Sequence, residues 1–173
     1  PGNVSGVFIH ETHGNNPNFP RLAGWWGQNE TTRFSMKNSF DPIPGVDGWM
    51  LSNDNIIASV AHLASLDMFE KVGISELRKK SVLLTGYLEY LLVNNAAIKP
   101  HIKILTPKNK TERGCQLSIY FYTQGRKAFE HLTKNGVILD WREPNVIRMA
   151  PVPFYNTFQE VKRVVELMNQ VFV

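Results

Sequence analysis

The chain has 173 residues with a formal net charge of +4, and 43% of its residues are hydrophobic and 20% charged. This balance is typical of a globular protein and argues against long disordered segments. The small positive excess does not point to nucleic acid, and no apolar run reaches the roughly 18 residues that a membrane-spanning helix needs. Because the chain has no secretory signal pattern and does not begin with Met, we expect it to be a piece of a longer protein.

A single cysteine, Cys115, excludes an intrachain disulfide framework. One unpaired thiol suits a reducing compartment. We therefore expect a cytoplasmic protein.

The first half of the chain changes character near residue 53. Before that point Gly, Pro and Asn interrupt nearly every apolar run, and only residues 6–10 have the pattern of a buried strand. From Asn53 apolar residues return every three to four positions, which predicts a helix with an apolar stripe that Gly73 ends. A second helix is predicted over residues 74–94. Its expected buried face carries Leu77, Leu84, Leu88 and Leu91.

After Pro100 the apolar period falls to two, which indicates strands. The expected elements are a strand at 102–104, a strand at 115–121, a short helix around Ala128 ended by Asn135-Gly136, strands at 137–141 and 146–150, and a last helix opened by a capping box of Thr157 and Glu160. This β-β-α-β-β-α order predicts an antiparallel or mixed sheet with helices packed on one face.

Two adjacent tryptophans, Trp25 and Trp26, stand between glycines in a segment with little helical character. They are either core side chains or a rigid wall for an aromatic ring, with an indole N–H that donates to a phosphate. Ser52 and Asn53 have a similar pair of interpretations. They cap a helix that starts near Asp54, or they bind an anion at that helix start, and the two roles are compatible.

Arg148 is the most informative charged residue, because the surrounding run of residues 146–150 is otherwise apolar. A guanidinium in such a strand needs an anion. The anion is either the carboxylate of an internal salt bridge or a ligand carboxylate bound bidentately.

Other polar residues carry weaker signals. His10 and His13 lie three residues apart rather than at the spacing of a zinc-protease helix, so we expect no metal site there. Cys115 lies on the apolar side of its predicted strand, which disfavours a nucleophile.

Seven segments, taken in order, closely resemble the C-terminal part of the kynureninase family, and the resemblance covers nearly the whole chain. These segments are GWWG (24–27), TRF (32–34), IPGV (43–46), SN (52–53), LRKKSVLLTGYLEYL (77–91), RGCQL (113–117) and RMAPVPFYN (148–156). The resemblance implies an α/β enzyme of the fold-type I aminotransferase-like architecture with pyridoxal 5′-phosphate as cofactor. It implies hydrolysis of L-kynurenine, or 3-hydroxykynurenine, to anthranilate or 3-hydroxyanthranilate and L-alanine in tryptophan catabolism.

The resemblance also assigns roles to residues. Trp25 and Asn53 match cofactor-site residues that the family contributes across a homodimer interface. Trp26 and Ser52 match positions that line the substrate pocket. Arg148 matches the arginine that holds the substrate α-carboxylate.

The same resemblance implies a division into three parts: the end of the large cofactor domain with active-site and interface loops (1–52), connecting helices (53–99) and the C-terminal small α+β domain (100–173). The family's Schiff-base lysine lies before the position of Pro1, so no catalytic residue is assigned within this chain. We therefore expect the isolated polypeptide to be inactive.

Two alternatives stay open. The chain is a non-catalytic scaffold or interaction module derived from the small domain, or it belongs to a related pyridoxal-phosphate lyase such as a cysteine desulfurase. The place of Cys115 in a strand disfavours the second alternative.

Overall fold

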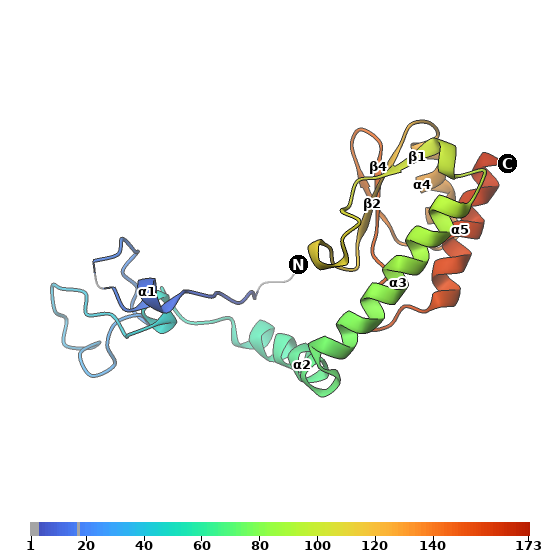
Figure 1. Ribbon diagram of the computed structural model, residues 1–173. Coiled ribbons are helices and arrows are strands. Elements are labelled where there is room, and N and C mark those ends of the chain that lie inside the picture. Colours follow the sequence, from blue (N-terminus) through green and yellow to red (C-terminus); the bar gives the residue numbers. More distant parts are fainter. Residues whose placement is uncertain (1–3, 17) are drawn as a thin grey trace. The chain divides into compact units, whose positions relative to one another are not determined.

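The computed structural model describes residues 4–16 and 18–173, which form two compact units (Figure 1). One unit extends to Phe69 and the other runs from Glu70 to Val173. The helices are α1 (Glu11–Gly14), α2 (Ile56–Val72), α3 (Ile74–Asn94), α4 (Gly125–Lys134) and α5 (Phe158–Phe172), and the strands are β1 (Ile102–Ile104), β2 (Leu117–Phe121), β3 (Asp140–Arg142) and β4 (Val146–Met149). Short 3-10 helices are η1 (Val46–Trp49), η2 (Lys99–His101) and η3 (Lys110–Glu112).

The second unit contains an antiparallel sheet in the order β1-β2-β4-β3. Together with α4 and α5 its strands give the predicted β-β-α-β-β-α order, which is confirmed. Three strands are shorter than predicted, because β2 begins at Leu117, β3 begins at Asp140 and β4 ends at Met149.

The core of this unit lies between one face of the sheet and the helices α3, α4 and α5 (Figure 1). Along β2 the side chains of Leu117, Ile119 and Phe121 are fully buried, while Ser118 and Tyr120 are only half-buried. Successive side chains of a strand point to opposite faces. The polar positions of β2 therefore lie on the sheet face opposite to the helices.

The helices of this unit follow the predicted patterns closely. α3 begins directly after Gly73, whose φ of 80° suits glycine, and it buries Leu77, Leu84 and Leu88 as expected. Leu91, the fourth expected leucine, is half-buried and packs against the core, and Leu92 beside it is fully buried. The predicted capping box at the start of α5 is present.

The first unit differs more from its predicted structure. Residues 6–10 form no strand and are mostly exposed, so that prediction was wrong. Apolar residues are spread around all sides of α2 between polar ones such as Asp67 and Glu70, and none of its residues is buried, so the expected single apolar stripe is absent. No helix in the described part of the chain combines the length and the apolar character needed to cross a membrane.

A buried ion pair ties the segment before β2 to α3. Arg113 Nη2 lies 2.6 Å from Glu89 Oε2, and the two side chains are 4% and 21% exposed. Arg113 Nη1 also donates to the Pro107 carbonyl at 3.2 Å. One guanidinium thus links this segment to the helix that supports the sheet.

We predict that Arg113→Met lowers the free energy of unfolding by about 3 kcal/mol, because it leaves the largely buried carboxylate of Glu89 without a cation. The matched control is Arg126→Met, which removes an exposed i,i+4 pair with Glu130 and should cost less than about 1 kcal/mol. Urea unfolding curves of both variants measure the difference. Equal losses would contradict the assignment of Arg113 as a structural anchor.

Candidate functional site

The segment from Gly24 to Gly27 lies directly against the backbone of residues 48–51. The Trp25 amide donates to the Leu51 carbonyl at 3.0 Å, and the Gly27 amide donates to the Met50 carbonyl at 2.8 Å. A Cβ atom at position 24 would lie 2.2 Å from Leu51 Cα, and one at position 27 would lie 2.8 Å from the Gly48 carbonyl oxygen. Both positions require glycine because the two backbones touch there.

This contact brings together four of the five residues that the sequence singled out. Trp25 and Trp26 lie on one segment, and Ser52 and Asn53 directly follow Leu51 on the other. Both Ser52 and Asn53 are exposed. The cluster is therefore set by backbone pairing.

Ser52 and Asn53 do not cap the following helix. α2 begins at Ile56, and the Ala58 amide donates to Asn55 Oδ1 at 3.1 Å, so Asn55 is the cap. The prediction of a helix start near Asp54 capped by Ser52 or Asn53 was wrong. Capping consequently does not explain either side chain.

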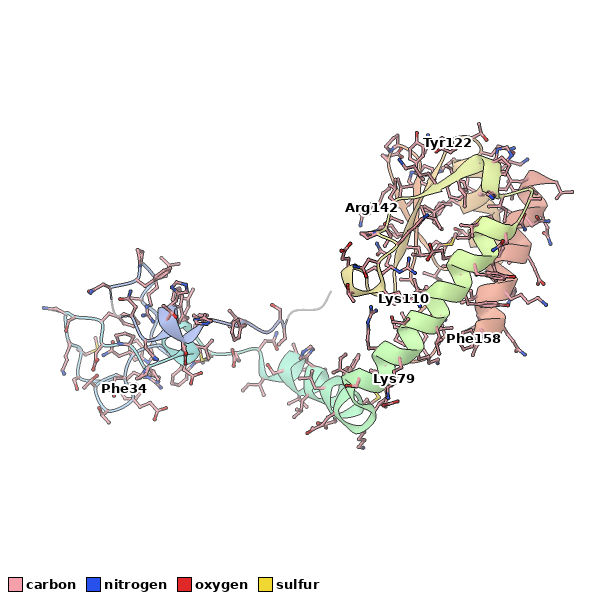
Figure 2. All side chains as sticks on the ribbon, viewed as in Figure 1. Phe34, Lys79, Lys110, Tyr122, Arg142 and Phe158 are labelled. Carbon is pink, nitrogen blue, oxygen red and sulfur yellow. The ribbon has the colours of Figure 1, made fainter. Side chains whose placement is uncertain are left out.

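The two tryptophans have different surroundings. Trp25 is 52% exposed and its ring meets that of Phe34 edge-on, with ring centroids 5.8 Å apart, so it is not a core side chain. Phe34 is drawn and labelled in Figure 2. Trp26 is half-buried, and the guanidinium carbon of Arg33 lies 4.2 Å from its ring centroid. Sequence analysis gave Arg33 and Phe34 no role, although both belong to the TRF segment.

Arg148, the fifth predicted residue, lies in the second unit on β4. Its register partners are Ser118 on β2 and Asp140 on β3, which places this row on the sheet face opposite to the helices. Nε and Nη2 of Arg148 both contact Asp140 Oδ2, and the Arg148 side chain is 34% exposed. Of the two partners that the sequence allowed for Arg148, the structure shows the carboxylate of an internal salt bridge.

The electrostatics of Asp140 keep this pair intact at neutral pH. Desolvation on its own raises the pKa of Asp140, but hydrogen bonds from Arg148 and Arg142, with their positive charges, outweigh it and lower the pKa below the ordinary 3.8. The carboxylate stays ionised above that range, and the stabilisation is lost only when the pH falls through the lowered pKa. Arg148 therefore has a permanent anionic neighbour.

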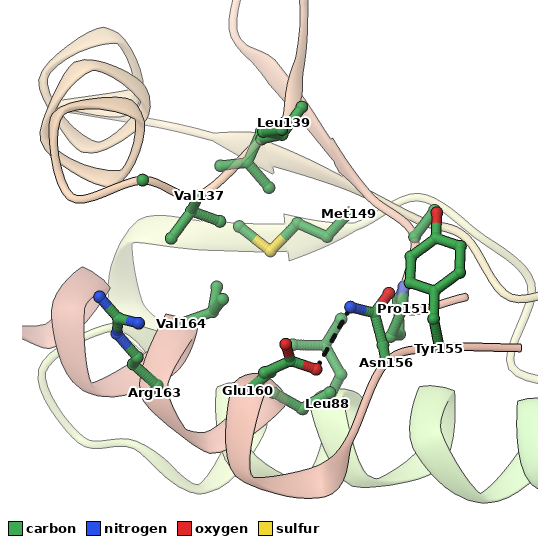
Figure 3. Close-up of a pocket in the computed structure, with 14 residues that line it drawn as sticks. Leu88, Val137, Leu139, Met149, Pro151, Tyr155, Asn156, Glu160, Arg163 and Val164 are labelled. Atoms are coloured by element: carbon green, nitrogen blue, oxygen red, sulfur yellow. Dashed lines mark hydrogen bonds between the residues drawn. The ribbon is translucent and has the colours of Figure 1, made fainter. Parts of the chain in front are cut away.

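A pocket in the second unit lies elsewhere, on the helix side of the sheet (Figure 3). Its walls include Val137, Met149 and Val164, and Asn156 donates to Glu160 at its edge. The Thr157 amide, with the side chains of Asn156 and Thr157, lowers the pKa of Glu160, whose carboxylate belongs to the capping box. None of the five predicted residues lines this pocket. Most of its lining residues are apolar residues of the kind that form any core, so the sequence contains no indication of a pocket here.

The remaining candidates form no site. The His10 ring accepts a hydrogen bond from the Thr12 amide, and the His13 ring packs on Phe19 at 5.0 Å. Within residues 4–16 and 18–173 no group of three or more His, Cys, Asp or Glu is arranged to hold a metal. Cys115 lies two residues before β2, so the prediction that it belongs to this strand was wrong. Its carbonyl accepts a hydrogen bond from the Thr85 hydroxyl at 3.3 Å.

Known relatives match the chain over most of its length. Proteins named kynureninase are 51% identical in Flavobacterium psychrophilum, over 93% of this chain and 38% of the relative, and 42% identical in Nematostella vectensis, over 99% of this chain and 39% of the relative. A kynureninase of Xanthomonas campestris is 47% identical over 96% of this chain and 39% of the relative. The chain thus spans about two fifths of the length of these curated relatives.

Solved structures confirm the expected fold class. A cysteine desulfurase from Thermococcus onnurineus matches with a TM-score of 0.67 at 12% identity, over 88% of this chain and 39% of that chain. The cystine C–S lyase C-DES, in complex with its product cysteine persulfide, matches with a TM-score of 0.61 at 16% identity, over 87% and 38% of the two chains. At these identities the likeness concerns the fold alone.

The family model of the kynureninase C-terminal domain matches residues 77–168, which is more than half of the chain. The seven ordered sequence segments, the α+β fold and this match agree. The chain belongs to the kynureninase family.

Proposed function

We propose that this chain is the C-terminal part of a kynureninase, which hydrolyses L-kynurenine and 3-hydroxykynurenine to anthranilate or 3-hydroxyanthranilate and L-alanine. The observation that carries the proposal is the glycine-dependent backbone contact that sets Trp25 and Trp26 beside Ser52 and Asn53. Identity of 51% to a relative named kynureninase supports it.

The residues of this cluster fit pyridoxal 5′-phosphate as cofactor. Trp25 offers a flat, half-exposed indole whose N–H has no acceptor among the described residues, and Asn53 offers an exposed amide. Indole and amide N–H groups are donors suited to a phosphate or to ring substituents. When bound, the cofactor supplies the electron sink that cleavage of the substrate carbon skeleton requires. We assign Trp25 and Asn53 to its binding.

Trp26, Ser52 and Arg148 are the proposed substrate-binding residues. Trp26 presents an aromatic ring to the aromatic ring of kynurenine, and the exposed Ser52 hydroxyl is available as a hydrogen-bond partner. Asp140 contacts the Nε–Nη2 edge of Arg148 and thereby orients the guanidinium plane. The Nη1 side of the fork then remains for the substrate carboxylate.

We also propose that the enzyme is a cytoplasmic homodimer in which Trp25 and Asn53 serve the active site of the partner subunit. Many exposed large apolar side chains on α2 support a further protein surface around this helix, because exposed apolar surface of this extent is typical of an interaction site. Alignment with only 38–39% of the relatives' length supports the same view.

The proposed function predicts that the full-length protein with pyridoxal 5′-phosphate converts kynurenine to anthranilate. The isolated 173-residue chain should show no turnover, because the family's Schiff-base lysine is not among its assigned residues. Anthranilate release, followed by its fluorescence, measures both. Turnover by the isolated chain would refute its inactivity, and a full-length protein without turnover would refute the function.

Loss of the Arg148 fork should raise the KM for kynurenine. In Arg148→Met we expect a rise of at least tenfold, since a charged hydrogen-bonded contact is worth about 1.5–3 kcal/mol. The matched control is Arg142→Met, which removes the other guanidinium on Asp140 Oδ2, at 2.9 Å. Steady-state kinetics of the full-length variants should give a nearly unchanged KM for the control. A KM unaffected in Arg148→Met would exclude its role in substrate binding.

The backbone contact itself can be tested by Gly24→Ala. The new Cβ atom would meet Leu51 Cα at 2.2 Å, so the two segments must separate and cofactor affinity should fall by tenfold or more. Gly86→Ala in α3 is the control, because nothing lies within 4 Å of its added Cβ and alanine favours a helix by about 1 kcal/mol. Titration of the apoenzyme with pyridoxal 5′-phosphate measures both affinities. Unchanged affinity in Gly24→Ala would argue against the assembled cluster.

A further inference from the structure

Arg33 holds Trp26 by its ring and by its backbone. The guanidinium carbon lies 4.2 Å from the centre of the Trp26 ring, and Nη2 donates to the Trp26 carbonyl at 3.1 Å. The same nitrogen lies 3.3 Å from the Gln28 carbonyl. A planar cation over an indole combines stacking with electrostatic attraction. The Arg33 side chain therefore restrains both the indole ring and the backbone of Trp26.

The loop that carries Arg33 is itself anchored to the tryptophan segment. Gln28 Nε2 donates to the Thr32 hydroxyl at 3.0 Å, and the Thr32 amide donates to the Asn29 carbonyl at 3.1 Å. Gln28 Oε1 also accepts from the Asp41 amide at 3.0 Å. These bonds hold the loop of residues 29–34 against the tryptophan segment, so the backbone that carries Arg33 is restrained.

The charge of Arg33 is directed at the ring and not at a carboxylate. Within the described chain Arg33 makes no ion pair, and its Nε is buried without a hydrogen-bond partner. A buried N–H left unpaired is costly. The arrangement keeps the guanidinium over the Trp26 ring at the expense of that hydrogen bond. The Arg33 side chain covers one face of the indole, and stacking of a ligand ring needs the other face.

We propose that Arg33 is a positioning residue for substrate binding, which fixes the Trp26 indole so that its second face stacks on the aromatic ring of the substrate. This inference rests on the proposed function for the identity of the substrate. The contact between Arg33 and Trp26 does not depend on it.

The test uses the full-length protein with its cofactor and anthranilate as an aromatic probe. Arg33→Met keeps a long side chain but loses the charge and the planar fork. We expect the Kd for anthranilate and the KM for kynurenine to rise about tenfold while kcat changes by less than about twofold. In a Trp26→Phe background the same substitution should have little further effect, because the residue acts through Trp26.

Arg21→Met is the matched control. Arg21 lies over Trp49 with its guanidinium carbon 4.7 Å from the ring centroid, a stack of the same kind on a tryptophan outside the proposed pocket. Its loss should leave the Kd for anthranilate unchanged. An equal rise in both variants, or an effect of Arg33→Met that adds in full to Trp26→Phe, would overturn the proposal.

Two further measurements separate this inference from folding defects and from the proposed function. Arg33→Lys retains a cation, so it should restore part of the affinity even if Arg33→Met folds poorly. Acrylamide quenching of tryptophan fluorescence should be stronger in Arg33→Met than in the wild type. The double variant should be quenched no more strongly than Trp26→Phe alone. Absence of kynurenine turnover in the wild type would contradict the proposed function but not the positioning role of Arg33. Unchanged quenching in Arg33→Met would contradict the positioning role but not the proposed function.

Discussion

The contact between the backbones of residues 24–27 and 48–51 is possible only because no Cβ atom stands between them. The first unit depends on it because that unit has no hydrophobic core of its own: every fully buried apolar side chain in the described chain lies at Leu77 or beyond. Its buried residues are glycines, Gly14, Gly27 and Gly48. Backbone hydrogen bonds hold it instead, and within it one arginine lies over Trp26 and another over Trp49. Such contacts fix local geometry with little apolar burial.

The second unit is organised by the opposite principle. Strict alternation along β2 and β4 sends Ile119 and Ile147 into the core and leaves Ser118 and Arg148 on the other face of the sheet. A charged side chain is tolerated in this otherwise apolar strand because it lies outside the core and pairs with Asp140. The packed core thus holds β4 rigid and thereby fixes the position of the Arg148 guanidinium on the other face of the sheet. Its orientation follows from strand register and from an ion pair.

Sequence pattern predicted the second unit well because each of its elements has one buried face. The same logic fails for α2, where apolar residues surround the helix and no stripe exists to detect. It fails for residues 6–10, because an apolar run becomes a strand only if a partner strand is available. The family resemblance named the five candidate residues, which remain a prediction, but the sequence did not predict how the chain brings four of them together. The pairing of Trp25 with Leu51 joins positions 26 residues apart in a segment without periodicity, and Asn55 lies closer to the start of α2 than the residues expected to cap it.

The cluster of Trp25, Trp26, Ser52 and Asn53 lies in a unit without its own core, and this has a thermodynamic consequence. The side chains around Trp26 are ordered by a few polar contacts, so their free energy of ordering is small compared with that of the sheet unit. A second subunit that covered the exposed apolar side chains of α2, as proposed above, would add to that order. On the proposed function, binding of cofactor and association with a second subunit would stabilise the same residues, and each would strengthen the other. Arg33 matters most in this setting, because it restrains Trp26 through contacts internal to the unit.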